Sequence, residues 1–163
     1  MSYTPMSDLG QQGLFDITRL LLQQPDLAAL SETLTRLVQQ SALADEAAII
    51  LWNAGNHRAA RYACDEAGHP VSYEDETVLA HGPVRRLLSR PDALHCDHET
   101  FADTWPQLIR SGLYRPFGYY SLLPLAADGR IFGGCEFLRR DNRPWSEKEF
   151  QRLHTFTQIV AVV

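Results

Sequence analysis

The stretch that decides the fold is Gly129–Leu153, GRIFGGCEFLRRDNRPWSEKEFQRL, in which a strand-like run, a charged loop and a helix start follow one another. Its segment Ser-Glu-Lys-Glu, residues 146–149, fits a capping box. The Ser146 hydroxyl can accept from the Glu149 N–H, and the Glu149 carboxylate can accept from the Ser146 N–H. Trp145 before the cap and Phe150 inside the helix occupy the two positions of a hydrophobic staple. We therefore predict a helix that begins directly after Ser146.

This predicted helix carries two apolar stripes. One consists of Phe150, Leu153, Thr157 and Val160, and the second of Phe156, Ile159 and Val163. No Gly or Pro ends the helix, so we expect it to continue beyond Val163 in a parent protein. A monomer that exposed either stripe would present several hundred Å² of apolar surface, which soluble monomers seldom tolerate. We therefore predict self-association through terminal helices, with an interface made of Leu14, Ile17, Leu21, Phe156, Ile159 and Val163.

Composition limits the possible classes of protein. With 163 residues, 45% of them hydrophobic, the chain can form one globular domain over residues 1–163. No apolar run approaches the roughly 18 residues of a membrane span, and the start lacks a basic secretory n-region. The net charge is −5 and the cations are scattered, so we expect no nucleic-acid binding by these residues. Three cysteines without a C-x-x-C motif are typical of a cytoplasmic protein.

The order of elements along the chain predicts an α+β fold. We expect a helix through Leu14, Ile17 and Leu21, and a second helix that Asp26 caps. Strands are expected at Ala47–Trp52, which is apolar on both faces, and at His57–Cys64, Ala93–Cys96, Tyr119–Ala126 and Ile131–Arg139. Helices are expected after Gly82-Pro83 and after Asp97, with Pro106 ending or kinking the latter. The dipeptide Asp128-Gly129 predicts a hairpin turn. This order implies a mostly antiparallel sheet with helices on both faces.

These residues resemble a known family. The run GRIFGGCEFL followed by PWSEKEFQRLHTFTQIV resembles the closing signature of GAF domains, which are related to PAS domains. SLLPLAADG is similar to that family's strand before a hairpin, and GPVRRLLSRPDALHC to its pocket-edge helix and strand. The resemblance covers nearly the whole chain and implies a GAF-like sensory domain.

Three further strings, MSYTPMSDLGQQGLFDITR, YEDETVLAHGPVR and IFGGCEF, resemble the amino-terminal region of formate-responsive, sigma-54-dependent transcriptional activators. The resemblance implies a cytoplasmic domain that controls an ATPase and a helix-turn-helix module downstream in the same chain. Neither a G-x-x-x-x-G-K loop nor a basic reading helix is present here, so we expect neither ATP hydrolysis nor DNA binding from these residues. A second GAF domain, which the resemblance also implies, is the alternative place for formate.

A formate site would be weak and small. At about −1.5 kcal/mol for each of three heavy atoms, formate gains at most about −4.5 kcal/mol, or a Kd on the order of 1 mM. Free N–H groups at a helix start or an Arg fork are suitable partners for a carboxylate. We therefore place candidate ligand-binding residues around the helix start at Gly82-Pro83: His81, Val84, Arg85, His95, Tyr120 and Cys135. Arg85 on a solvated helix face and a buried structural Cys135 are the competing interpretations.

Three other interpretations remain open or are disfavoured. The run His95-Cys96-Asp97-His98 contains metal-ligand types, but adjacent strand residues point apart, so we expect neither a metal nor another cofactor. Free methionine-(R)-sulfoxide reductases are stand-alone GAF domains that use three cysteines. The cysteines here lie 32 and 39 residues apart, wider than that family's cluster, and we expect no catalysis. A purely structural dimerisation module that binds nothing is the third alternative.

Overall fold

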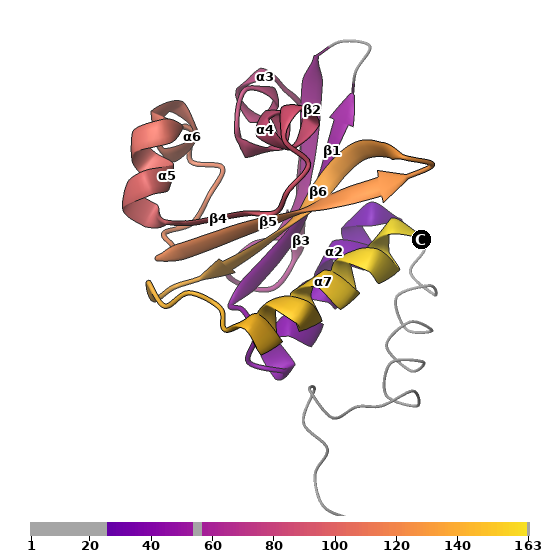
Figure 1. Cartoon of the computed structure of the whole chain (residues 1–163). Helices are drawn as coiled ribbons and strands as arrows, with labels where there is room; N and C mark the ends of the chain where they lie inside the picture. Colours follow the sequence, from indigo (N-terminus) through magenta and orange to yellow (C-terminus); the bar gives the residue numbers. More distant parts are fainter. Residues whose placement is uncertain (1–25, 54–56, 163) are drawn as a thin grey trace, which may run out of the picture.

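A computed structural model describes residues 26–53 and 57–162 and contains one antiparallel sheet (Figure 1). Its six strands lie in the order β3-β2-β1-β6-β5-β4. They are β1 (Glu46–Asn53), β2 (Arg58–Cys64), β3 (Pro70–Glu76), β4 (Leu94–Asp97), β5 (Tyr119–Ala127) and β6 (Arg130–Arg139). The central position of β1 and β6 agrees with the burial of most of their residues, because a strand covered on both faces is largely apolar on both.

Helices cover both faces of this sheet. The long helices α2 (Leu27–Gln40) and α7 (Glu147–Ala161) lie against one face (Figure 1). The other face carries four short helices, α3 (Thr77–Ala80), α4 (Pro83–Ser89), α5 (His98–Thr104) and α6 (Pro106–Ser111). The predicted α+β class with a mostly antiparallel sheet is therefore confirmed.

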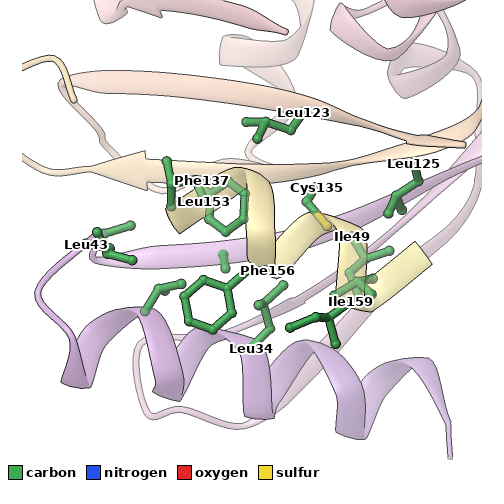
Figure 2. Close-up of a cluster of buried hydrophobic side chains, with 14 of the residues drawn as sticks. Leu34, Leu43, Ile49, Leu123, Leu125, Cys135, Phe137, Leu153, Phe156 and Ile159 are labelled. Atoms are coloured by element: carbon green, nitrogen blue, oxygen red, sulfur yellow. The ribbon is translucent and has the colours of Figure 1, made fainter. Parts of the chain in front are cut away.

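The face under α2 and α7 is an apolar core. Asp26 fixes the start of α2, because its carboxylate accepts from the Ala29 N–H at 2.8 Å. Leu34 of α2, Ile49 of β1, Phe137 of β6 and Phe156 of α7 meet in one buried cluster (Figure 2). Full burial of each such side chain contributes about 1.5–3 kcal/mol. This cluster therefore fixes both long helices on the sheet.

The capping box of α7 is confirmed. The Ser146 hydroxyl accepts from the Glu149 N–H at 3.1 Å, and the Glu149 carboxylate accepts from the Ser146 N–H at 2.9 Å. Arg139, at the end of β6, donates to the same carboxylate at 2.8 Å and lies over the ring of Trp145. Burial alone would raise the pKa of Glu149, but the Ser146 N–H and the Arg139 guanidinium outweigh it and lower that pKa. The helix start is thereby tied to the sheet.

The described residues of both apolar stripes of α7 face the interior of the domain: Phe150 is half-buried and the others are buried. The buried side chains are those of Leu153, Phe156, Thr157, Ile159 and Val160. All of them except Thr157 belong to the apolar cluster between the long helices and the sheet. The exposed apolar patch on which the self-association hypothesis depended is therefore not found at Phe156 or Ile159. Leu14, Ile17, Leu21 and Val163 lie outside the described residues. Self-association itself stays a prediction, for which sedimentation velocity is the measurement.

The turns and short elements between these strands and helices agree in part with the sequence-based predictions. Asp128 and Gly129 both have positive φ, 52° and 75°, as a two-residue hairpin turn requires, so that prediction is confirmed. Strand β3 and helix α3 were not predicted. Pro106 ends α5, as expected, but it also begins α6, because proline is well tolerated at the first helical position.

We predict that Ser146→Ala lowers the free energy of unfolding by about 1 kcal/mol, because one acceptor for the orphan N–H groups of α7 is lost. Urea denaturation followed by circular dichroism measures the change. Gln158→Ala, at an exposed position of the same helix, is the matched control and should leave the unfolding midpoint nearly unchanged. Equal midpoints for Ser146→Ala and the unsubstituted chain would contradict the capping box.

Candidate functional site

A buried ion pair lies on the sheet face that the short helices cover. Arg61 of β2 and Glu136 of β6 are 1% and 0% exposed. The Arg61 Nε donates to Glu136 Oε1 at 2.7 Å, and the hydroxyls of Tyr114 and Tyr120 both donate to Glu136 Oε2. An isolated buried carboxylate would be very unfavourable, so three donors, one of them charged, explain why it can stay there.

Sheet register explains how two charges on non-adjacent strands meet. Strand β1 separates β2 from β6, with Ile50 opposite Arg61 and Ala48 opposite Glu136. Alternate residues of β1 share a face, so Ala48 lies on the same side of the sheet as the two charged residues. Its methyl side chain leaves room for the long Arg61 side chain to reach across β1 to the carboxylate.

The electrostatics of the ion pair keep Arg61 charged. Burial alone would lower its pKa, but the negative charges of Glu136 and Glu46 outweigh burial and raise it. The pKa values of Tyr114 and Tyr120 are raised well above the usual range, first by burial and then by the Glu136 carboxylate, so both hydroxyls remain protonated donors. The Arg61 Cζ also lies 4.2 Å from the ring centroid of Tyr114, a cation–π distance.

Not all of the guanidinium N–H groups in this region are bonded. The Arg61 Nη1 donates to the Leu113 carbonyl at 3.0 Å, whereas its buried Nη2 has no hydrogen-bond partner among the described residues. Glu46 Oε1 is 3.8 Å from Nη2, too far for a hydrogen bond, and 3.3 Å from the Arg115 Nη2. The buried Nε of Arg115 likewise finds no acceptor in the part of the chain that the structure describes.

Both arginines line a hollow of about 220 Å³ between β2, β3 and the loop after α6. Its lining comprises Glu46, Arg61, Cys64, Asp65, Glu66, Val71, Tyr73, Gly112, Leu113 and Arg115. Buried polar groups in folded proteins almost always have partners, so unbonded guanidinium N–H groups beside a hollow are suited to a water molecule or another oxygen acceptor. A carboxylate suits such donors best, because charge-assisted hydrogen bonds are about twice as strong as neutral ones.

The structure does not bring the six predicted ligand-binding residues together. His81 and Arg85 are exposed and contact each other at 3.0 Å, while Val84 and Tyr120 are buried on the face of the short helices. His95 lies on the opposite face, where its ring contacts Phe150 and its Nδ1 is hydrogen-bonded to Ser121. Cys135 is also on that opposite face, in the apolar cluster. These residues therefore do not form one pocket.

The helix start at Gly82 is also closed. A Cβ at Gly82 would collide with the Leu108 side chain of α6, so that side chain packs directly against the backbone at the start of α4. The ligand-binding residues predicted from the sequence did not include the buried ion pair or its charged and aromatic neighbours, which are Arg61, Glu136, Tyr114, Arg115 and Glu46. A charged residue at an inward position of an otherwise apolar strand, as in RAARYAC and GGCEFL, was the available signal.

The three cysteines are separated by intervening strands. Cys64 on β2 and Cys135 on β6 flank β1, and Cys96 on β4 is separated from β6 by β5. At about 4.8 Å between neighbouring strands, next-but-one strands lie about 10 Å apart, beyond the Cα separation of a disulfide. Burial raises the pKa of Cys64, that of Cys96 to about 11 and that of Cys135 to about 12. This arrangement does not favour thiolate chemistry.

We predict slow alkylation of all three thiols in the folded chain at pH 7.5, because only the thiolate reacts and the raised pKa values keep the thiols neutral. Mass spectrometry after iodoacetamide treatment measures the reaction, with the chain in concentrated guanidinium chloride as control. Rapid modification of the native chain, or a disulfide after mild oxidation, would contradict this arrangement.

We also predict that Glu136→Gln lowers the free energy of unfolding by about 3 kcal/mol, because the Arg61 charge would remain buried without its counter-ion. The double variant Arg61→Met/Glu136→Leu should lose less than the sum of the two single changes, since it removes both charges. Chemical denaturation measures both, and Glu99→Gln at an exposed position is the matched control. Additive losses would mean that the two side chains are not coupled.

Comparisons with known proteins place the chain in a family. A family model described as "GAF domain" matches residues 26–163. The formate hydrogenlyase transcriptional activators of Salmonella typhimurium (strain LT2) and Escherichia coli (strain K12) are 74% and 71% identical over all 163 residues. The chain spans 24% of the length of these relatives.

Solved structures show the same fold at low sequence identity. The GAF domain of a phosphoenolpyruvate-protein phosphotransferase from Coxiella burnetii has a TM-score of 0.69 at 12% identity, covering 91% of this chain and 88% of that one. Free methionine-R-sulfoxide reductase from Neisseria meningitidis has a TM-score of 0.65 at 12% identity, covering 99% and 92%. Within the described residues, no helix is long and apolar enough to cross a membrane. The match over residues 26–163 shows that the chain belongs to the GAF domain family.

Proposed function

We propose that this chain is the regulatory domain of a formate-responsive, sigma-54-dependent transcriptional activator in the cytoplasm, and that it binds formate. The single observation that carries the proposal is 74% identity, over every residue of the chain, to formate hydrogenlyase transcriptional activators. ATP hydrolysis and DNA binding would belong to other parts of the parent protein, which this domain would control through its connections to them.

The polar interior of the domain supports a role in binding a small anion. Two arginines with unbonded N–H groups line a hollow that is small even for a ligand site, since pockets for drug-sized molecules measure about 300–1,000 Å³. A ligand of three heavy atoms needs little more than two charge-assisted hydrogen bonds, and it would bind with a Kd on the order of 1 mM.

A reductase function has less support. Similarity to the methionine sulfoxide reductases is at the level of the fold alone, at 12% identity or lower. The cysteines of this chain are buried, on separate strands, and their raised pKa values disfavour the nucleophilic thiolate that such a reaction needs. The 74% identical relatives are described as transcriptional activators. We therefore favour a regulatory role without catalysis or a cofactor.

A domain exchange tests the proposal. The matching segment of the Salmonella typhimurium activator is replaced by this chain, and a reporter gene under its control is measured at rising formate concentrations. We expect a formate-dependent response close to that of the unaltered activator, because about three quarters of the residues are identical.

The matched control carries the Coxiella burnetii GAF domain, which has the same fold at 12% identity, and should not respond to formate. A formate response in this control would place formate sensing elsewhere in the activator and overturn the proposal. Expression that is equal with and without formate in the first chimera would favour the structural dimerisation alternative instead.

A further inference from the structure

We propose that formate binds in the hollow beside β2 and β3, bridging Arg61 and Arg115 in competition with Glu46. This inference rests on the proposed function and assigns its ligand to particular atoms. One formate oxygen accepts from the Arg61 Nη2, and the second accepts from the Arg115 Nε.

Arg61 is the fixed half of this site. Its side chain is 2% exposed, and its Nε and Nη1 are held by Glu136 at 2.7 Å and by the Leu113 carbonyl at 3.0 Å. These two bonds and the contact with the Tyr114 ring leave Nη2 as the nitrogen without a partner among the described residues. The guanidinium is therefore already oriented before any ligand arrives, so the rearrangement that binding requires is confined to Glu46 and Arg115.

Arg115 is the movable half. Its side chain is 25% exposed and forms an ion pair with Glu46, whose Oε1 lies 3.3 Å from the Arg115 Nη2. That same oxygen is 3.8 Å from the Arg61 Nη2, so one carboxylate oxygen stands between two guanidinium groups without satisfying both. A carboxylate with two free oxygens satisfies the donors better, because each oxygen takes its own N–H group.

The charges and the size of the hollow select the ligand. Arg61 and Arg115 are balanced by Glu46 and Glu136, and the exposed Asp65 and Glu66 add negative charge to the lining. A dianion would be repelled by these carboxylates more strongly than a monoanion, which would take the place of the Glu46 carboxylate beside the arginines. The volume of about 220 Å³ fits a small monocarboxylate.

Titration of the 163-residue chain with sodium formate tests the site. Binding is followed by two-dimensional NMR at constant ionic strength, with sodium chloride as the control anion. We expect Arg115→Gln to weaken formate binding about tenfold or more, because a hydrogen bond between charged groups is lost. Arg110→Gln, which changes an exposed arginine of α6, is the matched control and should leave the affinity unchanged. Arg115 is chosen over Arg61 because Arg61→Gln can unfold the domain.

Substitution of Glu46, the competing carboxylate, should have the opposite effect on formate affinity. Glu46→Gln should tighten formate binding, by up to about fivefold, because the ligand no longer displaces an ion pair from Arg115. Glu66→Gln is the matched control at the rim, and its effect should be smaller.

Equal formate affinities for Arg115→Gln and the unsubstituted chain would overturn the site, as would chloride competing as well as formate. A chain that binds no formate, although the domain-exchange activator responds to it, would also overturn the site and the proposed formate binding, and would leave the regulatory role of the domain standing. Failure of the domain exchange itself would remove the proposed function.

Discussion

The ion pair between Arg61 and Glu136 is the interaction around which one half of the domain is arranged. Two charges buried on a sheet need every available partner, and the partners come from β5, from the loop after α6 and from β1. Such a pair is seldom the most stable way to fill a core, because apolar residues of similar volume often stabilise more. The ion pair is therefore weak evidence for stability, and what the structure shows directly is that it orients a guanidinium beside a hollow.

The two faces of the sheet differ in the chemistry of the side chains that they bury. Under α2 and α7 the core is apolar and closed, and Phe137, Phe156 and their neighbours fix the long helices. Under the short helices the interior is aromatic and charged. Strand β6 belongs to both faces: Glu136 holds the ion pair, and Arg139 at the end of the strand holds the capping box of α7 through Glu149. Strand β6 thus carries both the buried carboxylate of the polar face and the arginine that ties the start of α7 to the sheet.

Much of the fold could be predicted because its sequence signals are local. The site could not, because it depends on contacts between residues far apart in the sequence. The cap at Ser146, the cap at Asp26 and the Asp-Gly turn each act within a few residues, so the sequence alone reveals them. Strand β3 was missed because PVSYEDE is polar, as the edge strand of a sheet can be. Arg61 and Glu136 are 75 residues apart, and a charged residue in a strand is normally taken as exposed. His95 and Cys135 were predicted as site residues because the sequence does not show which face of the sheet their side chains occupy.

A three-atom ligand constrains its protein more than a large one does. Formate gains at most about −4.5 kcal/mol on binding, which leaves almost nothing to reorder side chains or to open a closed pocket. At least one of its partners must therefore be charged, oriented and desolvated before it binds. Holding a guanidinium in that state requires a permanent counter-ion and further hydrogen bonds, and Glu136, Leu113 and Tyr114 supply them here. The buried polar cluster, unfavourable as a core, would meet these requirements at the proposed formate site.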